Sequence, residues 1–432
     1  MIKIALVSLG CEKNLVDSEM ILGLFNSLDF EIIDDLGKAN LIVINTCGFI
    51  DSAKEEAINT IYECLQYKEN GAKVVVTGCL VERYLDELSS GIKDVDLWIP
   101  LRYYNKFGEL IGELFGNKDY CNVKLINKNR VISTPKHLAY VKISDGCNNR
   151  CNYCAIPLIR GNFRSEPKDD ILDQVKYLVK SGRKEICLIS QDLTRYGTDI
   201  NYSLEELLLE ITKIPGDYKI RMLYLYPDEI SDKLIEIVRD NDKIMPYFDI
   251  PVQHGSNKIL KWMNRRGTKE FIKELVLKIR KEIPNSIIRT TMIVGFPHES
   301  EKDFKELIDF IMGVKFDHLG AFTYSKEEGT KGFDMNNQVP KKVKEKRWND
   351  LMEVQKYISL NLNSERIGMT TPCIIEAYDE ESNTYYGRNY MYAPDDIDGA
   401  IIINSDRKLE IGEVVNIEIY EADFYDLYAN VI

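Results

Sequence analysis

Short apolar runs rich in β-branched residues alternate with amphipathic stretches along the first 125 residues of the chain. Three such pairs occur, each with the apolar run first: 2–8 and 17–28, 41–46 and 51–68, and 73–77 and 81–89. Strands that alternate with helices in this way are typical of an open parallel sheet covered by helices. We therefore predict an N-terminal α/β domain over residues 1–125.

Six further strand candidates recur at wide spacing after the polar connection NKNRVISTPK. They read AYVKIS, EICLIS, IRMLYLY, MPYFDIP, IIRTTMIVG and HLGAFTY, with helical patterns between most of them. Six strand–helix units predict a partial parallel (β/α)6 barrel with functional loops at the carboxyl ends of its strands. A charged helical stretch, 339–359, follows, and we assign residues 135–365 to this second domain.

Residues 366–432 change character. Five short strand candidates, PCIIEAY, TYYGRNYMY, GAIIIN, VVNIEIYEA and LYANVI, are separated by turn residues. Short strands at this spacing predict a small β-barrel. The whole chain is therefore predicted to be an α/β protein of three domains.

Composition and charge narrow the range of functions. With 44% hydrophobic residues the chain can bury sizeable cores, which excludes a disordered chain. No apolar run approaches the ~18 residues that a membrane-spanning helix needs, and the N-terminal MIKIALVSLG reads as a strand and not as a signal peptide. We therefore expect a cytoplasmic protein without membrane contact. The net charge of −13 argues against nonspecific binding to nucleic acid, although it allows a local basic groove.

Three cysteines, Cys11, Cys47 and Cys79, follow the first three strand candidates; we call them the N-terminal set. Ligand sites of open α/β sheets gather at the carboxyl ends of parallel strands, so the three thiols are expected to converge on a metal site. A glycine adjoins each of them and lets the backbone approach a bulky cofactor. The alternative is that each cysteine is a small buried residue near a strand end. The other four cysteines outside the two sets lack such context.

The stretch DGCNNRCNYCAIP holds the barrel set, Cys147, Cys151 and Cys154, at the spacing C-x3-C-x2-C. A structural zinc site would need a fourth protein ligand, and the nearest histidine, His137, precedes Cys147 by ten residues. A [4Fe–4S] cluster on three thiolates would instead leave one iron open. The spacing, on a loop after AYVKIS, resembles that of the radical S-adenosylmethionine (SAM) enzymes, in which SAM binds that open iron.

The resemblance extends along most of the chain. The stretches SLGCEKNLVDSE, ISQDLTRYG, YFDIPVQHGS, MNRRG, IRTTMIVGFPHE and FTYSKEEGT are similar to those of the radical SAM methylthiotransferases, and within them to the RimO family of ribosomal-protein aspartate methylthiotransferases. The tail then resembles a TRAM-type β-barrel. Glu12 departs from a common proline of that family, and His298 stands where glycine is usual.

The resemblance implies SAM and two [4Fe–4S] clusters as cofactors. It further implies that a radical derived from SAM removes a hydrogen from the β-carbon of an aspartate, and that a second cluster on the N-terminal set supplies the methylthio sulfur. An electron donor and a sulfur donor are the implied partners. The implied substrate is small-subunit ribosomal protein S-twelve, a basic protein, with RNA contact allowed through the ribosome.

Five side chains are candidates for contact with SAM, and no residue is assigned as catalytic. The resemblance implies Tyr153 as a neighbour of the adenine. Gln191, Asp192, Gln253 and Arg289 are polar residues at or near barrel strands, where such contacts belong. The alternative for Tyr153 is a loop aromatic residue that caps the barrel. Loop capping is the alternative for Gln191 and Asp192, and an internal ion pair is the alternative for Arg289.

Two other functions fit parts of the pattern. A tRNA adenosine methylthiotransferase would share the domains and the chemistry. An iron–sulfur carrier without catalysis would need neither a whole barrel nor two clusters that each lack one protein ligand, because carriers normally coordinate every iron.

The charge of the tail bears on the choice of substrate. Residues 366–432 hold four basic and fourteen acidic residues, a net charge of −10. A phosphate-binding surface should be basic, whereas an acidic one suits a basic partner. We therefore expect the tail to dock the ribosomal protein through an acidic face that includes Asp395, Asp396 and Asp398, the alternative being a merely solvated acidic surface.

Overall fold

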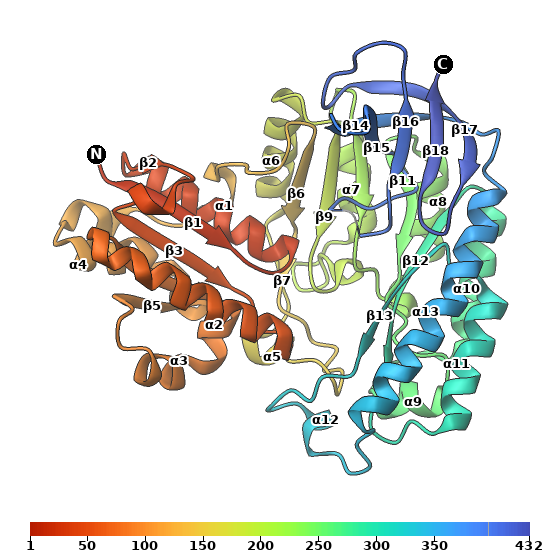
Figure 1. Ribbon diagram of the computed structural model, residues 1–432, viewed down its shortest axis with the longest axis horizontal. Coiled ribbons are helices and arrows are strands. Elements are labelled where there is room, and N and C mark those ends of the chain that lie inside the picture. The colour runs from red at the N-terminus through yellow and green to blue at the C-terminus, as the bar shows by residue number, and fades with distance from the viewer. Residues whose placement is uncertain (396) are drawn as a thin grey trace.

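The computed structural model describes residues 1–395 and 397–432, which form three connected parts (Figure 1). The first is a parallel sheet of five strands in the order β2-β1-β3-β4-β5. Its strands are β1 (Lys3–Ser8), β2 (Glu31–Ile32), β3 (Leu41–Thr46), β4 (Lys73–Gly78) and β5 (Leu97–Pro100), and its helices are α1 (Glu12–Ser27), α2 (Asp51–Leu65), α3 (Cys79–Gly91) and α4 (Phe107–Phe115).

Alternation along the strands decides which helix packs on which face of this sheet. On β3, Ile42 and Ile44 point toward α2 and α3, whereas Leu41 and Val43 point toward α1 and α4. Both faces of the sheet are therefore buried, as expected for parallel strands that read as continuous apolar runs.

The second part is an open sheet of six parallel strands in the order β13-β12-β11-β10-β9-β6, which confirms the partial barrel. The strands are β6 (Leu138–Lys142), β9 (Glu185–Ile189), β10 (Lys219–Met222), β11 (Ile244–Asp249), β12 (Ile287–Val294) and β13 (His318–Thr323). Its outer face is covered by α6 (Lys168–Lys180), α7 (Leu204–Thr212), α8 (Asp232–Asp240), α10 (Lys269–Glu282) and α11 (Glu301–Val314). Shorter elements lie in its loops, namely β7 (Ser144–Asp145), α5 (Ile156–Ile159), β8 (Arg164–Ser165), α9 (Asn257–Trp262) and α12 (Lys331–Asp334).

A long helix, α13 (Lys341–Ser364), leads to a closed five-stranded barrel in the order β14-β15-β16-β18-β17. Its strands are β14 (Thr370–Asp379), β15 (Thr384–Arg388), β16 (Ile401–Asn404), β17 (Val414–Ala422) and β18 (Leu427–Val431). In Figure 1 this small barrel (blue) lies at one end of the central sheet, and α12 lies near the other end. The predicted α/β class and the small terminal barrel are thus confirmed.

The segment between β15 and β16 packs onto the inner face of the central sheet; we call it the plug segment (residues 389–395 and 397–398). Arg221 of β10 donates to the carbonyl oxygens of Asn389 and Tyr390, at 3.0 and 3.1 Å. Met391, Tyr392 and Ala393 lie in one apolar cluster with Tyr140 of β6 and Tyr247 of β11. The plug segment therefore covers the sheet face that the helices leave bare.

This arrangement corrects one part of the expected acidic face. Asp398 is buried: its carboxylate binds Arg289 at 3.1 Å and accepts a hydrogen bond from the Tyr247 hydroxyl. Asp395 stays exposed and accepts a hydrogen bond from Tyr140, and Asp396 lies outside the described residues. Asp398 was wrongly placed on the surface because a run of acidic residues in a loop does not reveal which of them face an arginine in another domain.

Among the helices in the described part of the chain, none combines the length and the apolar character that crossing a bilayer demands.

Candidate active site

The N-terminal set lies along one edge of the first sheet. Cys11 immediately precedes α1, Cys47 follows β3, and Cys79 is the first residue of α3. The loops touch: a Cβ on Gly10 would lie 2.7 Å from the Cβ of Cys47. The side chain of Asn14 links the loops further, since its Nδ2 donates to the carbonyl oxygens of Leu9 and Thr46 and its Oδ1 lies 3.4 Å from the Cys79 sulfur.

The barrel set occupies the loop between β7 and α5. Within it, the amide of Cys154 donates to the carbonyl oxygen of Cys151 at 3.0 Å, and the amide of Cys147 donates to that of Gly161 at 3.2 Å. Asn152 fastens the loop to the barrel, because its backbone and side-chain nitrogens donate to the carbonyl oxygens of Met263 and Trp262. The loop is thus held from both sides.

Burial governs the acidity of these thiols. Burial raises the pKa of Cys147 to about 11. It raises the pKa of Cys79 to about 12, although the nearby Arg160 guanidinium acts to lower that pKa. Burial also raises the pKa of Cys47 and of Cys154. Neighbouring thiols of the same set raise the pKa of these cysteines as well, which places the members of each set within electrostatic reach of one another. Iron would therefore have to displace protons on binding.

The donor chemistry fits iron–sulfur clusters. No three His, Cys, Asp or Glu side chains in residues 1–395 and 397–432 converge tightly enough to share one metal ion. A [4Fe–4S] cluster makes no such demand, because each thiolate binds a different iron. In addition, the Oε1 atom of Gln191 is buried beside the barrel-set loop and has no hydrogen-bond partner among the described residues, as expected where a polar ligand belongs.

Arg160 links the N-terminal set to the start of the barrel-set loop. It follows α5, its side chain is buried, and its guanidinium donates to Asp17 Oδ2 and Asn14 Oδ1 of α1, each at 2.6 Å. It also lies 3.3 Å from the Cys79 sulfur and 3.3 Å from Asp145, two residues before Cys147. The sequence pattern gave this residue no role, although its place in CAIPLIRG, six residues after Cys154, was a usable signal.

Two of the predicted SAM contacts brace the barrel-set loop. Gln191 Nε2 donates to Asp145 Oδ1 at 3.0 Å. Asp192 is buried and accepts hydrogen bonds from Asn149 at 2.6 Å and from Thr194 at 2.7 Å, while burial raises its pKa. Both residues therefore lie beside the barrel-set loop, and their contact with SAM stays a prediction.

The other three predicted contacts differ in their surroundings. Tyr153 packs on an apolar cluster that contains Met263 and Phe296. Gln253 has a left-handed backbone with φ of 79°, a strained conformation for a residue other than glycine. Its backbone N–H donates to the carbonyl oxygen of Thr291. Arg289 makes internal ion pairs with Asp249, at 2.9 Å, and with Asp398 of the plug segment. The alternative prediction for Arg289, an internal ion pair, is thus what the structure contains.

A second arginine, also without a role in the sequence patterns, contacts the barrel set. Arg265 stacks its guanidinium 3.9 Å from the centroid of the Tyr226 ring and donates to the carbonyl oxygen of Pro251 at 2.6 Å. Its Nη1 lies 3.9 Å from the Cys151 sulfur. Its position in the stretch MNRRG was the only sequence signal.

The two departures from the family pattern have clear local roles. Glu12 lies 3.6 Å from Lys13 Nζ and accepts a hydrogen bond from the Tyr224 hydroxyl at 2.9 Å. His298 has φ of 69°, a conformation that explains why glycine is usual there, and its ring stacks on Trp262 at 4.1 Å between centroids.

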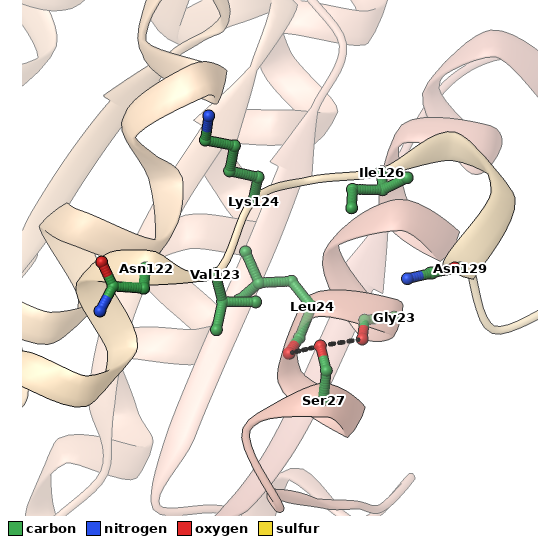
Figure 2. A pocket seen from close by; sticks show the side chains of 8 residues that line it. All are labelled: Gly23, Leu24, Ser27, Asn122, Val123, Lys124, Ile126 and Asn129. Carbon is green, nitrogen blue, oxygen red and sulfur yellow. Dashed lines mark hydrogen bonds between the residues drawn. The ribbon is translucent and has the colours of Figure 1, made fainter.

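The described cavities lie elsewhere. One, of about 310 Å³, is lined by α1 and the chain after α4, and Ser27 donates there to the carbonyl oxygens of Gly23 and Leu24 (Figure 2). A second, of about 440 Å³, is lined by residues that include Arg130 and Tyr177. No predicted site residue lines either cavity.

Comparison with known proteins follows the same division of the chain. Residues 141–311 match the Radical SAM superfamily, residues 3–100 the uncharacterized protein family UPF0004, and residues 367–432 the TRAM domain.

Among solved structures, the radical SAM methyltransferase TsrM from Kitasatospora setae superposes with a TM-score of 0.60 at 12% identity, over 86% of this chain and 76% of that one. The cobalamin-dependent radical enzyme OxsB superposes with a TM-score of 0.52 at 14% identity, over 82% of this chain and 56% of that one. At such identities these structures establish the fold.

Curated relatives match from end to end. "Ribosomal protein uS12 methylthiotransferase RimO" of Acetivibrio thermocellus is 45% identical over 100% of this chain and 98% of its own length. Proteins of the same name from Clostridium botulinum strain Hall and Clostridioides difficile are 46% and 44% identical, over 99% and 100% of this chain and 97% and 99% of their own lengths. The chain therefore belongs to the RimO family of radical SAM methylthiotransferases.

Proposed function

We propose that this enzyme adds a methylthio group to the β-carbon of an aspartate in ribosomal protein uS12. Its family implies SAM and two [4Fe–4S] clusters as cofactors. We assign one cluster with SAM to the barrel set and the other cluster to the N-terminal set. When bound, these groups would supply the radical that removes the β-hydrogen and the sulfur that replaces it.

The contacts of Arg160 with Cys79 and with Asp145, at the start of the barrel-set loop, carry the proposal. Hydrogen removal and sulfur transfer act on one carbon atom, so both sites must face the same substrate in a fixed geometry. Arg160 leaves the barrel-set loop and reaches Cys79 in the other domain, which supports two sites that open on one gap. An iron–sulfur carrier would not need this convergence.

The chain's own side chains would hold the reactants. Asn152 fixes the barrel-set loop to the end of α9, and Arg265 bridges Cys151 of that loop and Pro251 after β11. The unpartnered Oε1 of Gln191 is free to accept a hydrogen bond from SAM, and Tyr153 offers an aromatic face beside Cys154. The buried ion pair between Asp17 of α1 and Lys142 of β6 would hold the two domains together beside the gap.

The acidic terminal barrel would dock the basic substrate. Glu418 and Glu421 lie exposed on β17, on either side of the exposed Tyr420. Complementary charge at such a face speeds encounter and selects the partner more than it adds affinity. Binding should weaken as salt rises, as for other exposed charges.

The central experiment offers anaerobically reconstituted enzyme both uS12 and a tRNA anticodon stem-loop. Reconstituted protein should hold about eight irons, four for each cluster. We expect a methylthio mass gain on uS12 alone. Replacing the barrel set with alanine should halve the iron and abolish SAM cleavage, whereas replacing the N-terminal set should stop methylthio transfer while 5′-deoxyadenosine release continues. Modification of the stem-loop with uS12 ignored would favour the tRNA enzyme instead.

A further inference from the structure

A buried lysine lies between the N-terminal set and the central sheet. Lys13 follows Cys11 by two residues and is 7% exposed. Its Nζ atom lies 3.3 Å from the centroid of the Tyr224 ring and 3.6 Å from Glu12 Oε2. The Tyr224 hydroxyl donates to the same carboxylate oxygen at 2.9 Å. The ammonium, the phenol and the carboxylate therefore form one small cluster in the gap between the two domains.

The central sheet fixes the position of this cluster. Tyr224 comes two residues after β10, at the carboxyl end of the strand, with a left-handed φ of 68°. Its amide donates to Asp249 Oδ2 at 2.9 Å, and its carbonyl oxygen accepts from the amide of Leu193 at 3.0 Å. Leu193 directly follows Asp192, so the backbone of Tyr224 ties the cluster to the loop that carries two of the predicted SAM contacts. A strained backbone at a residue other than glycine is often found where a side chain must be aimed.

Lys13 differs from the other buried cations around the gap. Arg160 donates to Asp17 and Asn14, Lys142 binds Asp17 and Asp145, and Arg289 binds Asp249 and Asp398. Within residues 1–395 and 397–432, by contrast, the one ion pair of the Lys13 ammonium is with the adjacent Glu12, at 3.6 Å. An ammonium has three donors, so this single long contact leaves it able to bind a second anion.

We propose that Lys13 binds the side-chain carboxylate of the aspartate that the enzyme modifies, with Glu12 holding the ammonium until the substrate arrives. This inference rests on the proposed function. The reacting β-carbon is bonded directly to that carboxylate, so an ion pair there positions the carbon between the two cysteine sets. A carboxylate that enters a buried gap also needs a cation. Adenosine carries no carboxylate, so the same contact selects against a nucleoside.

A double-mutant cycle between enzyme and substrate tests the proposal. The anaerobic holoenzyme is titrated with uS12 and with uS12 whose target aspartate is replaced by asparagine, and Kd is measured for both. We expect wild type to prefer the aspartate form by about 10- to 100-fold, the range for a hydrogen bond to a charged group. Lys13→Met should abolish this preference, and Lys13→Arg should keep most of it.

Lys243→Met is the matched control. Lys243 also lies over an aromatic ring, 4.5 Å from the centroid of Tyr218. It precedes β11, however, and therefore lies at the other end of the sheet. It should leave the preference intact. If Lys13→Met weakens binding of both substrates equally, Lys13 has only a structural role and the inference is overturned. In that case, modification of uS12 by the wild-type enzyme would still support the proposed function. Failure of wild type to modify uS12 would overturn both.

Discussion

Gly10 stands where two loops of the N-terminal sheet meet, and its backbone has φ of 90°. We predict that Gly10→Ala loses the cluster of the N-terminal set. A methyl group there would lie 2.7 Å from the Cβ of Cys47 and would displace that thiol. Iron analysis after reconstitution should give about four irons per chain, in place of about eight.

Gly71 provides the control for backbone strain. Its φ is 85°, and no atom lies within 4 Å of the place that a Cβ would occupy. Gly71→Ala should therefore cost about 1–2 kcal/mol of stability through its left-handed conformation alone and keep its full iron content. Equal iron loss in both variants would show that strain, and not the contact with Cys47, matters at Gly10.

At the scale of elements, the four-residue helix α5 delivers Arg160 into the gap between α1 and α3. We predict that Arg160→Met destabilises the protein by about 3–5 kcal/mol, because Lys142 alone would then face the two buried carboxylates of Asp17 and Asp145. The variant should also lose iron from the N-terminal set, since Cys79 loses its guanidinium neighbour. Denaturant unfolding and iron analysis measure the two effects.

Arg102→Met is the comparison for Arg160. Arg102 pairs with Glu82 of α3 at 2.6 Å, but its side chain is 47% exposed, so its loss should cost less than about 1 kcal/mol. Iron content should not change. An Arg160→Met protein that keeps both its stability and its iron would contradict the linking role.

The elements also show what a local pattern can and cannot predict. Strands β1, β3 and β4 and the cysteines that follow them were predicted, because apolar runs and the residues after them are local features. The short strands β2 and β5 were missed, since two to four residues carry little periodicity. Helix α1 begins at Glu12, earlier than expected, because its first turns are polar yet buried against the central sheet. The partners of those polar residues, such as Lys142 for Asp17, lie more than a hundred residues away.

At the scale of the whole molecule, Glu185 ties the central sheet to the terminal barrel. It binds Arg221 at 2.6 Å and Arg388 of β15 at 2.5 Å. Burial alone would raise the pKa of Glu185, but the two arginines lower it to about 2. A lowered folded-state pKa means that this contribution is complete above the unfolded pKa near 4.3 and is lost as pH falls toward about 2.

We therefore predict that the free energy of unfolding falls between about pH 4.5 and pH 2, partly through Glu185. Glu185→Gln should cost about 3–5 kcal/mol at pH 7 and flatten the acid dependence, which denaturant titrations at several pH values would measure. Asp217→Asn is the control: Asp217 pairs with the neighbouring Lys184 on the surface and is 87% exposed, so its loss should change little. An unchanged acid slope in Glu185→Gln would contradict the prediction.

The plug segment determines when the central domain can be finished. A ribosome makes the chain from its N-terminus, so all six strands of the sheet are synthesised before residues 389–398 appear. Until then Arg221 and Arg289 lack their partners from the plug segment, and the inner face of the sheet is open. A chain that stops short of the plug segment would lack these contacts and leave the inner face of the central sheet uncovered. Folding of the central domain is thus coupled to synthesis of the terminal barrel.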